Sequence, residues 1–98
     1  MSRIELAPEL ADDFDRILAH LAEYDVADAP SRLQDIIAAI DVLERNPLIG
    51  RPDTAGNREL VIGRGARGHV ALYRYAAAID TVFILAVRSQ RAAGYARP

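Results

Sequence analysis

The chain has 98 residues, 51% of them hydrophobic, with no cysteine and a net charge of −2. This length fits a single domain, residues 1–98, and the lack of cysteine excludes a disulfide framework, a thiolate nucleophile and a cysteine metal site. The longest purely apolar run, Val82–Val87, is too short to cross a bilayer, and the acidic N-terminus does not resemble a signal peptide. We therefore expect a soluble, cytoplasmic protein without a membrane association.

Charge is divided unevenly along the chain. Residues 1–57 carry twelve acidic side chains and five arginines, whereas residues 58–98 carry seven arginines and two acidic side chains. Every basic residue is arginine, and codon bias in a GC-rich genome explains the missing lysine but not this separation. Because the guanidinium fork suits carboxylate and phosphate groups, the second part of the chain is predicted to meet an anionic partner.

The first third of the chain predicts a short strand and then a helix. Arg3–Leu6 alternates polar and apolar residues, as a strand does. A helix over residues 8–24 follows, because Pro8 suits the first helical turn and apolar residues recur every three or four positions, at Leu10, Phe14, Ile17, Leu18 and Leu21. The acids between them, Asp12, Asp13 and Asp15, are expected on a solvated outer face.

A second helix is predicted after a short link at residues 25–30. Ser31 and Gln34 form a capping-box pattern, and Asn46-Pro47 ends the helix. Its apolar stripe consists of Leu33, Ile36, Ile37, Ile40 and Leu43. The short link implies that the two helices pack as an antiparallel hairpin.

The remainder of the chain predicts a sheet. After an irregular connection at residues 47–57, three runs are rich in β-branched and aromatic residues: Arg58–Ile62, His69–Ala76 and Ile79–Val87. Their short links favour antiparallel pairing. In the last run both alternating sets are apolar, Val82, Ile84 and Ala86 on one side and Phe83, Leu85 and Val87 on the other. We therefore expect an α+β fold: an N-terminal helical hairpin packed on a twisted antiparallel sheet of three to four strands, whose other face is covered by a partner.

The residues that could carry chemistry are few. The glycine-rich segment 63–68 lacks the Gly-Lys-Ser/Thr ending of a phosphate loop, so a turn that exposes Arg64 and Arg67 is favoured over a nucleotide site. The two histidines, His20 and His69, have no clustered carboxylates nearby, and no metal site is expected. His69 could act as a general base at a strand start, but a structural role is favoured.

The C-terminal segment, residues 88–98, gathers Arg88, Arg91 and Tyr95. Arginines beside an aromatic ring can bind a phosphate and stack on a base. An ordinary exposed tail is equally compatible with the composition. The choice between the two depends on what kind of protein the whole chain is.

The order of two helices followed by a sheet resembles the toxins of the RelE/ParE superfamily over nearly the whole chain. The resemblance lies in the run Arg58–Ile62, the apolar strand bearing Tyr73, the hydrophobic strand after it, and the Arg-Ser-Gln-Arg exit at residues 88–91. It implies a RelE/ParE-like fold, the toxin of a type II toxin–antitoxin system, no cofactor, and a cognate antitoxin that wraps the toxin in a hetero-oligomer. Operator DNA would be contacted only through the antitoxin.

The resemblance implies one of two activities. RelE-like members cleave messenger RNA in the ribosomal A site, and in that case Arg58, Arg91 and Tyr95 take the catalytic positions. Val70 stands on or beside the position of the central-strand arginine, and Leu60 near that of a second sheet base. Apolar groups there cannot neutralise phosphate charge, and electrostatic stabilisation is usually the largest catalytic contribution.

The resemblance to the ParE branch is therefore stronger, and it implies a gyrase inhibitor that causes growth arrest and serves plasmid stabilisation. An inactive module that acts with the antitoxin as corepressor is a third alternative. In the ParE-like interpretation no catalytic residue and no metal ligand is expected. Arg88, Arg91 and Tyr95 are predicted to contact DNA gyrase. A ParD-like antitoxin is predicted to contact Arg64, Arg67, Arg74 and Tyr73, laying a helix and an extended segment across the helices and the apolar sheet face.

Overall fold

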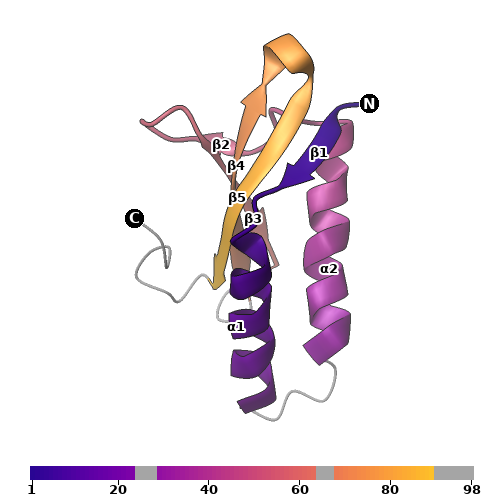
Figure 1. The fold of residues 1–98 in the computed structure, drawn as a ribbon, viewed down its shortest axis with the longest axis vertical. Coiled ribbons are helices and arrows are strands. Elements are labelled where there is room, and N and C mark those ends of the chain that lie inside the picture. The colour runs from indigo at the N-terminus through magenta and orange to yellow at the C-terminus, as the bar shows by residue number, and fades with distance from the viewer. Residues whose placement is uncertain (24–28, 64–67, 90–98) are drawn as a thin grey trace.

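A computed structural model describes residues 1–23, 29–63 and 68–89 of the chain. These residues form two helices, α1 (Leu10–Glu23) and α2 (Ala29–Asp41), and a sheet with the strand order β1-β5-β4-β3-β2. The strands are β1 (Arg3–Leu6), β2 (Arg51–Pro52), β3 (Arg58–Ile62), β4 (His69–Ala76) and β5 (Thr81–Ser89). The two helices lie side by side and run in opposite directions (Figure 1). The predicted α+β fold with a helical hairpin is confirmed.

The helices bury the predicted apolar stripes. Leu10 and Ile17 of α1 and Ile36 and Ile40 of α2 are buried, and a short 3₁₀ turn after α2 adds Leu43. The element bounds differ a little from the prediction: α1 begins at Leu10, and α2 begins two residues before Ser31, so the expected capping box lies inside the helix. Asp12 and Asp15 are exposed as predicted. The expectation for Asp13 is wrong, because its side chain is buried against the sheet.

The sheet is mixed and has five strands among the described residues, where three to four antiparallel strands were expected. The pairings of β4 with β3 and β5 are antiparallel as predicted. The N-terminal strand β1 joins the other edge of β5 in parallel, with Ile4 beside Val82. The segment predicted to be irregular contains β2, whose two residues pair with β3. Local links predict only neighbouring pairs, so the β1–β5 pairing had no local signal, whereas β2 and β3 are joined by the short link 53–57 and this hairpin was missed.

A β-bulge changes the predicted alternation in β5. Leu72 of β4 pairs with Ala86, but the next residue, Tyr73, pairs with Ile84, so Leu85 is the extra residue. Beyond the bulge the alternation of faces is shifted by one. Ile84 and Val87 therefore both lie in the core, three residues apart, and the predicted assignment of Val87 to the opposite face from Ile84 is wrong.

The core lies between the helices and one face of the sheet. Its buried members are Leu10, Ile17, Ile36, Ile40, Leu43, Ala71, Tyr73, Val82, Ile84 and Val87. Residues opposite one another on neighbouring strands share a face. The other side, called here the helix-free face, therefore carries Glu59, Val61, Val70, Leu72, Arg74, Phe83, Ala86 and Arg88.

Candidate functional site

The helix-free face combines arginines with apolar side chains. Arg88 Nη2 lies 3.9 Å from Glu59 Oε2, and Arg51 Nη2 lies 3.8 Å from Glu59 Oε1, so one carboxylate is shared by two arginines. Arg74 is exposed, while the Arg88 side chain is 21% exposed. Of the residues predicted to contact gyrase or the antitoxin, Arg74 and Arg88 thus lie on this face.

Val70 lies on this face on the central strand β4. It is 3% exposed and is paired with Val61 on one side and Arg88 on the other. Leu60, the other position where a ribonuclease of the superfamily would need a base, belongs to the opposite face and packs against the core. These two apolar side chains cannot stabilise a phosphate, and they lie on opposite faces of the sheet.

Arg58 and Tyr73 hold the loop that precedes β2. Arg58 Nη1 donates hydrogen bonds to the carbonyl oxygens of Leu48, at 3.0 Å, and Gly50, at 2.8 Å. The backbone N–H of Gly50 donates to the Tyr73 hydroxyl oxygen at 2.8 Å. Burial raises the pKa of Tyr73, while the Gly50 hydrogen bond and the charge of Arg58 lower it by less.

This arrangement reassigns both residues. Tyr73 was predicted to contact the antitoxin, but its side chain has no exposed surface and belongs to the core. Arg58, the ribonuclease candidate, directs its guanidinium at two backbone carbonyls on the helix side of the sheet. Its local geometry is that of a structural clamp, since a side chain held by its own loop is not presented to a substrate.

His69 begins β4 and is 8% exposed. Its pKa is lowered from 6.5, chiefly by burial and then by the positive charges of Arg32 and His20. The neutral imidazole is therefore the favoured form, but burial withholds it from a substrate. This placement favours the structural role over that of a general base.

The tip of the β4–β5 hairpin is tied to the N-terminus by polar contacts that the sequence did not reveal. Asp80, with a positive φ of 47°, accepts hydrogen bonds from the Ser2 hydroxyl at 2.6 Å and from the Tyr75 hydroxyl at 2.7 Å. The bond from Ser2, followed by that from Tyr75, lowers the pKa of Asp80. Ile79 beside it is 63% exposed. The hairpin tip is therefore a fixed projection with an apolar side chain.

An apolar groove lies between β1 and the helices. Its floor and walls are Ile4, Leu6, Phe14, Ile37 and Ile40, and the carboxylates of Asp41 and Glu44 complete its lining. Leu6 is 55% and Ile37 is 43% exposed. Two large apolar side chains that stay accessible in one concave site can receive an apolar segment of a partner.

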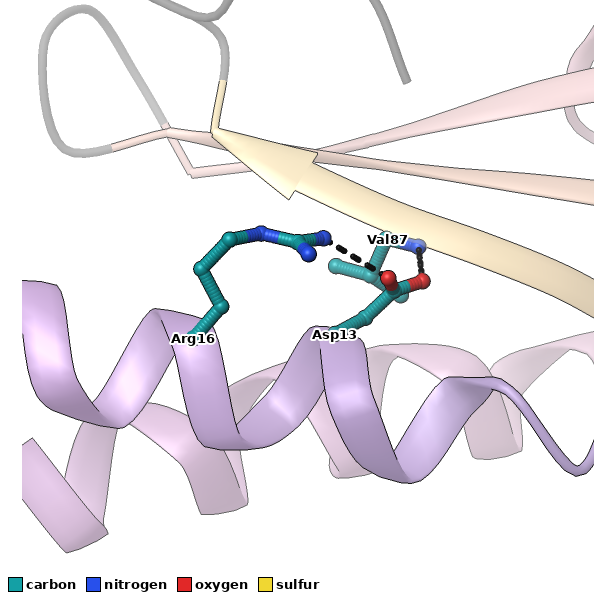
Figure 2. Close-up of polar contacts among 3 residues, drawn as sticks. All are labelled: Asp13, Arg16 and Val87. Carbon is teal, nitrogen blue, oxygen red and sulfur yellow. Dashed lines mark hydrogen bonds and ion pairs between the residues drawn. The ribbon is translucent and has the colours of Figure 1, made fainter. Parts of the chain in front are cut away.

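Asp13 is the other polar residue whose position the sequence analysis missed. Its Oδ2 atom accepts a hydrogen bond from the backbone N–H of Val87 at 3.0 Å, and its Oδ1 accepts one from Arg16 at 2.7 Å (Figure 2). A signal for burial existed in its spacing. Asp13 stands three residues after Leu10 and four before Ile17, which places it on the apolar stripe of the helix.

The remaining predicted site residues, Arg64, Arg67, Arg91 and Tyr95, lie outside the described residues. Within the part of the chain that the structure describes, no three His, Cys, Asp or Glu side chains are grouped to hold a metal ion. Neither described helix is long and apolar enough to span a membrane.

The chain is similar in sequence and structure to proteins of known families. Residues 4–94 match the family model described as the ParE toxin of the type II toxin–antitoxin system parDE. Comparison with curated protein sequences gives no significant match.

Two solved structures are similar to the chain. One, the chromosomal ParDE toxin–antitoxin system from P. aeruginosa, is 25% identical with a TM-score of 0.74, and the match covers 91% of this chain and 96% of that one. The other, the toxin–antitoxin complex RelBE2 from Mycobacterium tuberculosis, is 22% identical with a TM-score of 0.58, covering 91% and 98%. The second likeness supports the fold alone.

Proposed function

We propose that this chain, which belongs to the ParE toxin family of type II toxin–antitoxin systems, arrests growth by inhibiting DNA gyrase and thereby replication. A cognate ParD-like antitoxin neutralises it, and both act in the cytoplasm. The observation that carries this choice is the chemistry of the sheet. Val70 lies on the central strand of the helix-free face, and Arg58 is engaged with loop carbonyls.

A ribonuclease active site needs several preorganised cationic groups around the reacting phosphate, and loss of one such group typically costs about two to three orders of magnitude in rate. Two of the three positions that the RelE-like interpretation requires on the sheet are apolar here, Val70 and Leu60. The third, Arg58, faces the loop before β2. The geometry therefore favours a protein that acts by binding over one that cleaves RNA.

Binding of the target is assigned to Arg88 together with Arg91 and Tyr95. Arg88 stands on the helix-free face at the end of β5, where the chain leaves the sheet. Its Nη1 donates to the Ser89 carbonyl at 3.1 Å and its Nη2 lies 3.9 Å from Glu59, and an acidic group of the target is proposed to replace the long Glu59 contact.

The antitoxin is assigned to two other surfaces. An apolar face of an antitoxin helix fits the groove lined by Leu6, Phe14 and Ile37. An acidic extended segment of the antitoxin fits Arg74 on the helix-free face, together with Arg64 and Arg67. Buried apolar area then provides the affinity, and the paired charges provide specificity and a fast encounter.

Induction of the chain without antitoxin tests the choice between the two activities. Growth should stop while primer extension shows uncut messenger RNA, and co-expression of the antitoxin should restore growth. Alanine at both Arg88 and Arg91 should abolish the arrest and leave the fold intact, whereas Arg45→Ala, which removes one exposed charge after α2, should remain toxic. Codon-positioned cleavage in translated messages would instead establish the ribonuclease, with Arg91 and Tyr95 as its catalytic candidates.

A further inference from the structure

Two hydrogen bonds leave the same edge of β5 three residues apart. The carbonyl of Ile84 accepts the N–H of Ala7 at 2.9 Å, and the N–H of Val87 is donated to Asp13 Oδ2 at 3.0 Å. Backbone groups on one edge of a regular strand recur every two residues, because the strand has a period of two. The spacing of three is possible only because of the bulge at Leu85.

Asp13 supplies a hydrogen-bond acceptor where no strand continues. β1 ends at Leu6, beside Ile84, so the last residues of β5 have no strand on that edge. α1 crosses there, and Asp13 extends from it to the Val87 N–H, as Figure 2 shows. Its side chain is 1% exposed and accepts hydrogen bonds from Val87 and Arg16. Burying a carboxylate costs free energy of desolvation. We therefore expect the Asp13–Val87 hydrogen bond to have a structural role that an apolar side chain could not fill.

We propose that Asp13 is a positioning residue: it selects the bulged register of β5 and thereby places Arg88 on the helix-free face. A shift of one residue in a strand exchanges its two faces. Without the bulge, Val87 would point away from the core and Arg88 would point toward the helices. Only in the bulged register does the Val87 N–H face α1, so the hydrogen bond to Asp13 stabilises that register.

The consequence for the target rests on the proposed function, in which Arg88 binds gyrase. The proposed selection of the β5 register does not depend on that function. Val87 is 1% exposed in the core and Arg88 lies near Glu59, and both placements follow from the extra residue at Leu85.

Amide hydrogen exchange measured by NMR on the full chain tests the register. Asp13→Ala should lower the protection of the Val87 amide by about tenfold or more, since the acceptor is lost. Asp13→Asn retains an acceptor oxygen and should keep the protection. Arg16→Gln, the matched control, removes the ion pair but not the Val87 bond, and should leave the Val87 amide as it is. Unchanged protection in Asp13→Ala would overturn the proposal.

Growth arrest on induction tests the consequence. Asp13→Ala should lose toxicity, as is expected of Arg88→Ala. Asp13→Asn should remain toxic, because it keeps the acceptor oxygen although it removes the charge. If Asp13→Ala does not fold, Asp13→Asn carries the test, and loss of Val87 protection in that variant would overturn the proposal. If Asp13→Ala exposes Val87 while Arg88→Ala stays toxic, the register role stands and the role of Arg88 in the proposed function is wrong.

Discussion

Gly50 lies so close to Tyr73 that no side chain fits between them. A Cβ atom added there would be 2.6 Å from Tyr73 Cε1 and 2.9 Å from the Glu59 carbonyl oxygen. The Tyr73 hydroxyl in turn accepts a hydrogen bond from the Gly50 N–H. Arg58 donates to two carbonyl oxygens of the same loop and thereby restricts its movement. At the scale of single residues, the loop before β2 is therefore held to the sheet by the buried ring of Tyr73 and the guanidinium of Arg58.

Gly50→Ala should destabilise the protein by about 1–3 kcal/mol, because the backbone oxygen of Glu59 cannot move aside as a flexible side chain would. Urea unfolding measures the change. Tyr73→Phe should cost about 1–2 kcal/mol by leaving the buried Gly50 N–H without its acceptor. The double variant should lose less than the sum of the two, since Phe removes the hydroxyl contact but not the ring contact. An unchanged urea midpoint for Gly50→Ala would show that the loop is not held in this way.

His69 makes stability depend on pH. Its folded-state pKa lies below 6.5, so the unfolded chain takes up the proton first as the pH falls. The contribution of neutral His69 is fully present above the unfolded value and is lost as the pH drops toward the folded-state pKa. The free energy of unfolding should therefore rise between about pH 5 and pH 7.5, and His69→Gln should remove that part of the slope. The same slope in the variant and in the original chain would contradict the burial of this imidazole.

At the scale of elements, the sequence predicted what is encoded locally. The apolar stripes of α1 and α2 and the β-branched runs of β3, β4 and β5 follow from spacings within each segment. The parallel pairing of β1 with β5 joins segments about eighty positions apart in the chain, and β2 forms because β3 offers it an edge. No local spacing encodes the β1–β5 pairing, whereas the β2–β3 pairing is local and was missed because β2 has only two residues.

The same distinction applies to the candidate site. Arg74 and Arg88 were predicted as contact residues from residue type alone; the structure places both on the helix-free face, and their contacts with a partner stay a prediction. Tyr73 and Asp13 were misplaced because their surroundings depend on tertiary packing. The Tyr73 hydroxyl accepts a hydrogen bond from the Gly50 N–H, and the Asp13 carboxylate accepts one from the Val87 N–H. The bulge at Leu85 had no marker, since no glycine stands there.

The groove between β1 and the helices gives a prediction at this scale. Ile37→Glu should weaken antitoxin binding by about tenfold or more, because a charge would have to be buried against the apolar antitoxin helix that we propose for this groove. Isothermal titration measures the dissociation constant. Ile79→Glu is the matched control: Ile79 is also exposed but projects from the hairpin tip, and its replacement should leave the affinity unchanged. Equal losses in both variants would place the antitoxin elsewhere.

At the scale of the whole molecule, the charge division along the chain follows the layers only in part, because β1 and β2 of the acidic part belong to the sheet. The acidic residues 1–57 supply both helices, β1 and β2, while the arginine-rich residues 58–98 supply β3, β4 and β5. Among the described arginines of that second part, Arg74 and Arg88 lie on the helix-free face, which we propose meets a partner, and Arg58 lies on the helix side. We expect the sign of the charge to steer an acidic antitoxin segment to that face and away from the helices.

Association with the antitoxin should therefore slow as salt is added, since the screening length is only about 10 Å at 0.1 M ionic strength. Stopped-flow measurements over a salt series give the rate constants. Arg74→Ala should reduce the salt dependence, whereas Arg45→Ala should change it less because Arg45 follows α2 in the acidic part of the chain. A rate constant that is flat with salt would show that the arginines do not steer the encounter.

Supercoiling of relaxed plasmid DNA by purified gyrase tests the central claim most directly. The protein in excess should stop supercoiling, and the same amount bound to its antitoxin should not. The variant with alanine at both Arg88 and Arg91, folded and at equal concentration, should leave gyrase active. Normal supercoiling in the presence of excess folded protein would contradict the assignment of gyrase as the target.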